Sequence, residues 1–216
     1  MYSIARQKVD YPLYICIRDD HSDIDPEPVI REYFPNAIYE RNEKQEGFDV
    51  VFGDSLKLVP EDTDVVILQS ADVVHAEEYL INVLIDNVEP QVFTTVTVAN
   101  ADVPQDMYKN FEKGVEKVFK DWLVEGRFTR AGVGRRWYFF LGAMYKKDLE
   151  SFGLFGKPLC DVVLSDTMME RGIRPKFLVD LHGIHCNHPP TWIPCKNLHT
   201  CKKRCKLKKY FLGVWE

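Results

Sequence analysis

Residues 64–75 read Asp64-Val-Val-Ile-Leu-Gln-Ser-Ala-Asp-Val-Val-His75. The run from Val65 to Leu68 is continuously apolar and rich in β-branched side chains, which is typical of a strand buried on both faces of a sheet. The run then breaks into small and polar residues that end at Asp72. Apolar residues recur at helical spacing just beyond, which predicts a helix over 76–86. We therefore expect Asp72 at the carboxyl end of a buried strand, the edge where open α/β sheets bind ligands.

Length and charge set broad limits on the class of protein. The chain has 216 residues and a formal net charge of −5 at pH 7. This length is enough for a sizeable core and fits one domain over 1–216, and the acidic balance does not suggest a nucleic-acid partner. The N-terminal residues lack the apolar centre of a signal peptide, and no apolar run approaches the ~20 residues of a membrane span. We expect a cytoplasmic protein with no membrane span.

The remaining sequence alternates between strand-like and helix-like segments. A helix is expected to begin after Pro26, and a second over 104–125, where large apolar residues recur at spacings of three and four. Strand patterns occur at 13–17, 36–40, 48–54, 91–99, 137–141 and 174–180. This alternation predicts an α/β fold.

A buried strand that ends in a short acidic motif and leads to a helix resembles the core of the GT-A glycosyltransferases. Members of that family usually carry Asp-x-Asp at this position, and this chain has Ser70-Ala71-Asp72. The resemblance implies that these three residues contact the donor and that Asp72 binds Mn²⁺ or Mg²⁺ on its diphosphate. The first Asp of the motif is replaced by Ser70, which changes the contact that the family makes there. A second interpretation of Asp72 is that it caps the following helix.

Two later stretches also resemble this family. An aromatic strand leads to Gly142-Ala143 and then to a short helix that ends at Gly153. The resemblance implies that Gly142 and Ala143 lie beside the donor sugar, where small side chains leave room for a ring. Residues 160–172 resemble the acidic helix that supplies the base of inverting members. By this match Asp161 is the first candidate for the base and Asp166 the second, although Asp161 also fits an ordinary first-turn acid.

The resemblance extends to both ends of the chain. Ile17, Arg18, Asp19 and Asp20 end the first predicted strand, and by the match they would meet the nucleoside of the donor. Three histidines follow the last predicted strand, and many family members supply a metal-binding histidine from that region. His182 and His185 both fit by order, with His185 favoured.

The full match implies a single GT-A (Rossmann-like) domain with a mixed, mostly parallel central sheet flanked by helices. It implies a metal-dependent enzyme that transfers a sugar from a nucleotide-diphosphate donor, most simply a UDP-sugar, to a hydroxyl group on a glycan acceptor. The compact form is similar to the glycosyltransferase domains encoded by large algal viruses (chloroviruses). That narrower match implies action in the cytoplasm of a host cell.

Other interpretations stay open. A nucleotidyltransferase shares the fold and the use of a metal, and the missing first acid also fits an inactive transferase. The segment 182–216 is rich in Cys, His and Lys and is expected to pack near the site. Its cysteines also permit a zinc site, and its basic run at 196–209 fits a non-catalytic protein that binds an acidic partner. The cysteines in question are Cys186, Cys195, Cys201 and Cys205.

Overall fold

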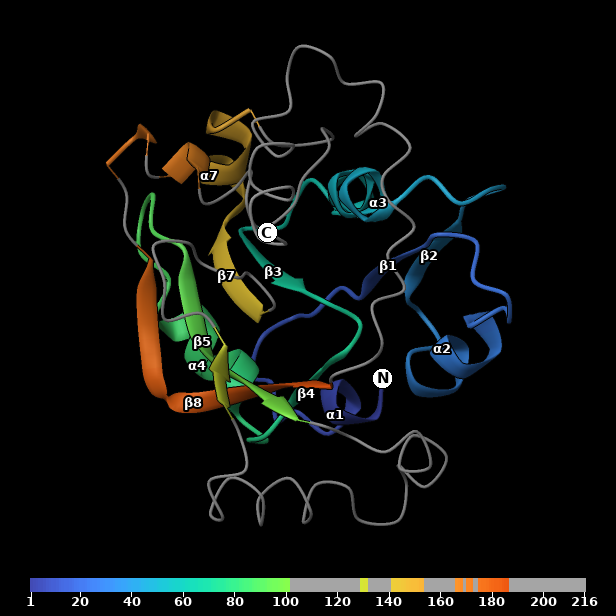
Figure 1. The fold of residues 1–216 in the computed structure, drawn as a ribbon, viewed down its shortest axis with the longest axis horizontal. Helices are drawn as coiled ribbons and strands as arrows, with labels where there is room; N and C mark the ends of the chain where they lie inside the picture. The colour runs from blue at the N-terminus through green and yellow to red at the C-terminus, as the bar shows by residue number, and fades with distance from the viewer. Residues whose placement is uncertain (102–128, 132–140, 154–165, 169, 173–174, 187–216) are drawn as a thin grey trace, which may run out of the picture.

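A computed structural model describes residues 1–101, 129–131, 141–153, 166–168, 170–172 and 175–186 (Figure 1). Its strands form a two-stranded parallel sheet, β1-β2, and a six-stranded sheet with the order β3-β7-β5-β8-β4, in which β6 also pairs with β5. The strands are β1 (Cys16–Asp19), β2 (Ile38–Arg41), β3 (Val65–Gln69), β4 (Val73–His75), β5 (Thr94–Ala101), β6 (Thr129–Ala131), β7 (Leu141–Tyr145) and β8 (Lys176–Cys186).

Short helices connect and cover these strands. They are α1 (Tyr2–Ala5), α2 (Glu27–Tyr33), α3 (Phe48–Ser55), the 3-10 turn η1 (Leu56–Leu58), α4 (Leu80–Asp86) and α7 (Lys146–Ser151). Residues 166–168 and 170 are also helical. None of the helices in the described ranges is both long enough and apolar enough to cross a membrane.

The larger sheet has an apolar core on each of its faces, and β3 contributes to both. Val66 and Leu68 pack in one core with residues of η1 and α7. Val65 and Ile67 pack against the other core, which contains Leu80 and Leu84 of α4. Because successive residues of a strand point to opposite faces, a strand covered on both sides must be apolar throughout. The expected strand and the α/β class are therefore confirmed, with Val66 and Leu68 buried on one face and Val65 and Ile67 half-buried on the other.

The directions of the strands only partly match the expected sheet. The sheet is mixed, as predicted, but four of its five pairings are antiparallel and only β5 with β8 is parallel. The expectation of a mostly parallel sheet is therefore wrong for these pairings. The reason is that β7 lies between β3 and β5 and runs antiparallel to both. In addition, the three-residue strand β4 runs antiparallel to β8, and the three-residue strand β6 runs antiparallel to β5. Consequently β3, β5 and β8 still run in one direction and end at the same edge.

Two predicted segments differ in type or extent. Residues 48–54, predicted as a strand, form α3 instead. The apolar residues include both an alternating set (48, 50 and 52) and a helical set (48, 51 and 52), so the sequence fits either period. The loop before α3 is held by a distant carboxylate, which sequence spacing does not reveal. The helix predicted over 76–86 begins only at Leu80, because residues 76–79 form a turn after β4 in which the carbonyl groups of Glu77 and Glu78 accept hydrogen bonds from Gln7 and Lys8. The helix predicted over 104–125 lies outside the described residues.

Gly142 is the second residue of β7, and it lies between Leu68 of β3 and Thr95 of β5. A Cβ atom at this position would stand 2.3 Å from a ring carbon of Phe93 and 2.8 Å from the carbonyl oxygen of Thr94. Phe93 itself is fully buried in the core shared with α7. The ring of Phe93 therefore fills the space that the missing side chain leaves, and position 142 requires glycine for packing.

We expect Gly142→Ala to lower the free energy of unfolding by about 3 kcal/mol, because overpacking forces a buried ring and a backbone carbonyl to move. Chemical denaturation measures the change. In a Phe93→Leu background the same substitution should cost at least about 1 kcal/mol less, since the ring is gone. Equal costs in both backgrounds would contradict this packing role.

Candidate functional site

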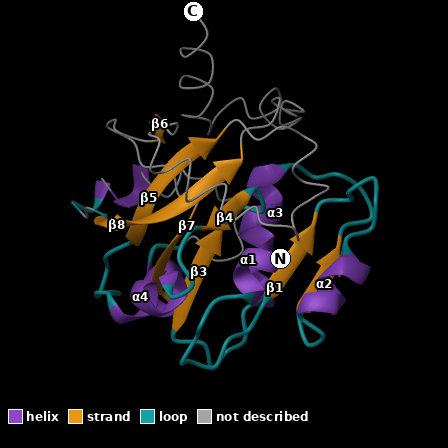
Figure 2. Ribbon diagram, turned by 90° about the horizontal axis from the view of Figure 1, so that it is seen from below, coloured by secondary structure: helices purple, strands orange, loops and turns teal. Residues whose placement is uncertain are grey.

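The carboxyl ends of β1, β2 and β3 lie toward the same edge of the molecule (Figure 2). Two groups of polar residues follow these strand ends. The first, called here the β1–β2 cluster, comprises residues 18–25 and 39–42, and the second is the β3–β4 turn, residues 69–75. The two groups contain most of the residues that the sequence singled out for donor and metal binding.

Asp19 organises the loop after β1. Its carboxylate is buried and forms an ion pair with Arg41 of β2, with 2.9 Å between Oδ2 and Nε. The same carboxylate accepts hydrogen bonds from the backbone N–H and the hydroxyl of Ser22. Arg41 in turn donates to the carbonyl oxygen of Ser22. Asp19 is thus neutralised within the protein and closes the turn that follows the strand.

Asp20 holds a different element. Its carboxylate accepts hydrogen bonds from the backbone N–H groups of Glu46 (2.8 Å) and Gly47 (2.9 Å), which precede α3. It also accepts one from the side-chain amide of Asn42, at 3.0 Å. A carboxylate near a helix N-terminus satisfies free backbone donors and interacts favourably with the helix dipole. Asp20 therefore fixes the start of α3.

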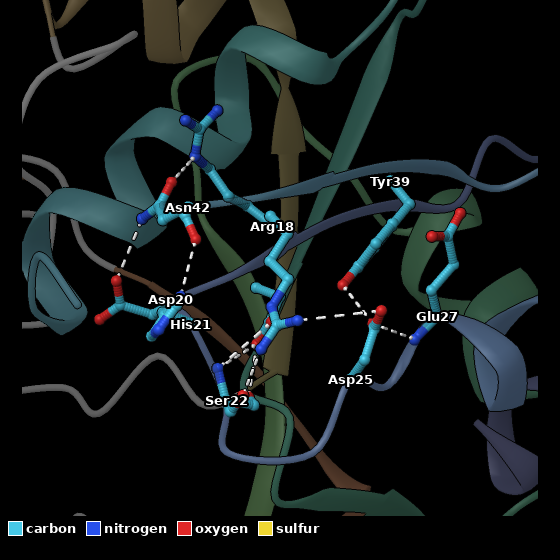
Figure 3. Close-up of polar contacts among 10 residues, drawn as sticks. Arg18, Asp20, His21, Ser22, Asp25, Glu27, Tyr39 and Asn42 are labelled. Carbon is cyan, nitrogen blue, oxygen red and sulfur yellow. Dashed lines mark hydrogen bonds and ion pairs between the residues drawn. The ribbon is translucent and has the colours of Figure 1, made fainter. Parts of the chain in front are cut away.

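Asn42 connects the end of β1 to the end of β2 through all four of its polar groups (Figure 3). Its backbone N–H donates to the carbonyl of Asp19 at 2.9 Å, and its carbonyl receives Nδ1 of His21 at 3.2 Å. Its side-chain oxygen accepts from Nε of Arg18 at 3.0 Å, and its side-chain N–H₂ donates to Asp20. One residue therefore fixes Arg18, Asp19 and Asp20 of the predicted nucleoside-binding segment, together with His21 that follows them.

A tyrosine and a carboxylate complete the β1–β2 cluster. The hydroxyl of Tyr39 donates to Oδ1 of Asp25 at 3.1 Å, and the same oxygen accepts from the backbone N–H of Glu27 at the start of α2. Burial and the bond to Asp25 raise the pKa of Tyr39 to about 12. The backbone bond from Glu27 lowers the pKa of Asp25. Asp25 therefore holds the backbone N–H of the first residue of α2.

Asp20→Asn should lower the free energy of unfolding by about 1–2 kcal/mol, because the hydrogen bonds to two backbone N–H groups lose their charged acceptor. Chemical denaturation of the purified variant checks this. Asp23→Asn is the matched control, since Asp23 is exposed on the same loop, and it should change stability by less than about 0.5 kcal/mol. Equal effects of the two substitutions would argue against the role of Asp20.

The β3–β4 turn contains a buried histidine whose tautomer follows from its contacts. The side-chain amide nitrogen of Gln69 donates to the carbonyl of Val73 at 3.0 Å, so its oxygen faces Nε2 of His75 at 2.9 Å. Nε2 of His75 must therefore carry the hydrogen. Its Nδ1 is a buried lone pair with no hydrogen-bond partner within the described part of the chain. Burial lowers the pKa of His75 to about 4, which keeps the ring neutral at neutral pH.

The sign of the pH effect follows from this lowered pKa. An unfolded histidine has a pKa near 6.5, so below that value the unfolded state binds a proton that folded His75 rejects. The stability due to neutral His75 is present above about pH 6.5 and should fall by about 3 kcal/mol as the pH drops to 4. Denaturation at a series of pH values measures this loss. His75→Gln keeps a hydrogen-bond donor for Gln69 and has no group that titrates, so its stability should not show this loss at low pH. If the stability of this variant and of the unmodified protein fell in parallel with pH, the prediction would be wrong.

The strand pairing brings Asp72 and His185 together. Asp72 is half-buried and immediately precedes β4, and Val73, the first residue of β4, is paired with His185 of β8. His182 is paired with Thr97 of β5. Of the two histidines that the resemblance implied as metal ligands, His185 is thus the one whose backbone lies next to Asp72. The side chains of His182 and His185 are outside the described atoms.

The predicted donor-binding and catalytic residues do not all reach this edge. Ser70 and Ala71 lie in the turn before Asp72, with Ser70 half-buried and Ala71 exposed. Gly142 and Ala143 are buried inside the sheet, and Phe93 fills the space beside Gly142. We therefore leave Gly142 and Ala143 out of the proposed site.

The two candidate bases also remain apart from Asp72. Asp166 belongs to the helical residues shortly before β8, and Met168, two residues later, lies in the same core as Leu149 and Phe152 at α7. That position is at the edge where β5 and β8 begin, opposite to the edge at which β3 ends. Asp161 lies outside the described residues. The structure therefore does not bring Asp166 and Asp72 together.

The residues present fit a divalent metal ion only in part. Asp72 supplies a carboxylate oxygen, the ligand type that Mg²⁺ and Mn²⁺ prefer. The pairing of Val73 with His185 brings the backbone of this histidine close to Asp72. Over the side chains that the structure describes, no three His, Cys, Asp or Glu residues are arranged to hold a metal. Mg²⁺ commonly keeps several waters and uses one or two protein ligands plus substrate phosphates, so two protein ligands are compatible with such a site.

Sequence reasoning missed several residues of the site. Arg41 was given no role, although it ends β2 and pairs with Asp19. Asn42, Gln69 and His75 were given no role. Asn42 directly follows the second predicted strand. If that strand pairs in parallel with the first one, Asn42 lies beside the residues that end the first strand, and its role could have been predicted on this basis. No sequence signal indicated that Gln69 and His75 would bond across the turn.

Comparison with known proteins gives no guide to the family. No family model matches the chain, and no curated protein matches it.

Proposed function

We propose that this protein is a metal-dependent transferase that binds a nucleoside diphosphate sugar and passes the sugar to a hydroxyl group. The observation that carries the proposal is the pairing of β4 with β8, which sets His185 beside Asp72 at the carboxyl edge of β3. These two residues are far apart in the sequence, and the resemblance to GT-A enzymes named both as metal ligands. Ligands of open α/β sheets bind at this kind of edge.

The β1–β2 cluster supports a nucleoside position at the same edge. Strands β1 and β2 are parallel, and their ends carry polar side chains held in fixed positions by Asn42. A site that is ordered before binding loses less conformational entropy when the ligand arrives. The nucleoside would lie at the end of β1 and the diphosphate toward Asp72.

The charges of the cluster are compatible with an anionic ligand. Arg41 neutralises Asp19, and two backbone N–H groups and Asn42 hold Asp20. Carboxylates that are paired within the protein repel a nearby phosphate less than free ones. The two aspartates therefore position the loop and the helix without closing the edge to a diphosphate.

Asp72 and His185 would hold the metal ion. When bound, Mn²⁺ or Mg²⁺ neutralises the charge that develops on the departing diphosphate. The residues of the chain bind and orient the donor. The turn that carries Asp72 is itself fixed by the bonds from Gln69 to Val73 and from His75 to Gln69, so the carboxylate lies on a constrained backbone.

Calorimetric titration with UDP and GDP, with and without Mn²⁺, tests the proposal. We expect metal-dependent binding of one of these nucleotides and a loss of more than about tenfold in affinity in Asp72→Asn, which removes a metal ligand. Asp64→Asn is the matched control, because Asp64 precedes the opposite end of β3 and is exposed. It should bind as the unmodified protein does.

Three results would count against this function. They are no binding of any nucleotide, binding that does not depend on metal, and equal losses in Asp72→Asn and Asp64→Asn. A strong preference for nucleoside triphosphates, with release of pyrophosphate, would instead indicate a nucleotidyltransferase.

A further inference from the structure

His21 has an unusual backbone conformation for its position. It follows the end of β1 and has a φ of 61°. Residues other than glycine avoid this left-handed region, although Asn, Asp and His enter it more readily than most. Outliers of this kind persist where the surroundings fix them, and they cluster at functional sites.

The contacts of His21 fix the tautomer of its ring. Nδ1 lies 3.2 Å from the carbonyl oxygen of Asn42, and a carbonyl can only accept a hydrogen bond. Nδ1 therefore carries the hydrogen, and Nε2 of the neutral ring carries the lone pair. The side chain is exposed, and Nε2 has no hydrogen-bond partner among the residues that the structure describes. Figure 3 places the ring beside Asp20 and Asn42.

The neighbouring polar groups already have partners in the protein. Arg18 binds Glu40 and Asn42, Asp19 binds Arg41 and Ser22, and Asp20 binds Asn42 and backbone N–H groups. The three charged residues that the sequence indicated for nucleoside binding are thus engaged in holding the loop. The His21 side chain is exposed but held by its hydrogen bond to Asn42, so packing contributes little to the stability of this conformation. Nε2 of His21 is therefore a neutral acceptor at the end of β1 that has no partner among the residues that the structure describes.

We infer that His21 selects the nucleobase of the donor, with Nε2 accepting a hydrogen bond from the ring N–H of uracil (N3–H) or guanine (N1–H). This inference rests on the proposed nucleotide-binding function. Uracil and guanine carry a ring N–H donor on the edge used for base pairing. Cytosine and adenine carry an acceptor lone pair there, which would face the lone pair of Nε2. Asn42 keeps the ring in the accepting tautomer, so the site favours one class of base.

The test uses UDP and N3-methyl-UDP, which differ in the imide hydrogen, together with CDP. Calorimetry with Mn²⁺ should give about tenfold weaker binding of N3-methyl-UDP and CDP than of UDP to the unmodified protein. His21→Asn keeps a residue that tolerates positive φ and removes the ring acceptor. In this variant UDP and N3-methyl-UDP should bind equally, within about twofold. His21→Gly, which adopts positive φ without strain, is a second variant if the first is unstable.

The outcomes separate this inference from the proposed function. Metal-dependent binding of UDP with no discrimination against N3-methyl-UDP would overturn the role of His21 and leave the function standing. Discrimination that survives in both variants would also overturn it, since another group would then read the base. Failure of the unmodified protein to bind any nucleotide would overturn the proposed function and the inference with it.

Discussion

Asn42 is the point on which the candidate site depends. Four hydrogen bonds from this one residue reach Arg18, Asp19, Asp20 and His21, and they tie the end of β1 to the end of β2. A parallel two-stranded sheet has few backbone bonds of its own, so side-chain bonds at its end contribute a large share of its order. Through Asp20 the same network reaches the start of α3, whose residue Phe52 packs against the main core.

The two described histidines of the site show how one side chain serves opposite purposes. His75 is buried, bonds through Nε2 and stays neutral because burial lowers its pKa. His21 is exposed and bonds through Nδ1. In each case an oxygen that can only accept decides which nitrogen carries the hydrogen. The first ring stiffens the turn beside Asp72, and the second leaves an acceptor at the surface.

The sequence predicted what depends on local pattern. The apolar run at 65–68, the proline-marked start of α2 and the end of α7 near Gly153 are all present, because hydrophobic period and turn residues act over a few positions. The antiparallel position of β7 and the helix at 48–55 were missed, since distant partners decide them. The position of Asp72 at a strand end was predictable, but the internal pairing of Asp19 and Asp20 required the three-dimensional arrangement.

The place of β7 in the larger sheet has a consequence for how the chain reaches its final form. The β1–β2 cluster is assembled from residues 16–47, which are close in sequence and can meet with a small loss of loop entropy. The edge at Asp72 is different, because β3 needs β7 and β4 needs β8, more distant in the chain. Contacts of such long separation form slowly. We therefore expect the β1–β2 cluster to form early in folding, and the edge at Asp72 to be completed only after β4 has paired with β8.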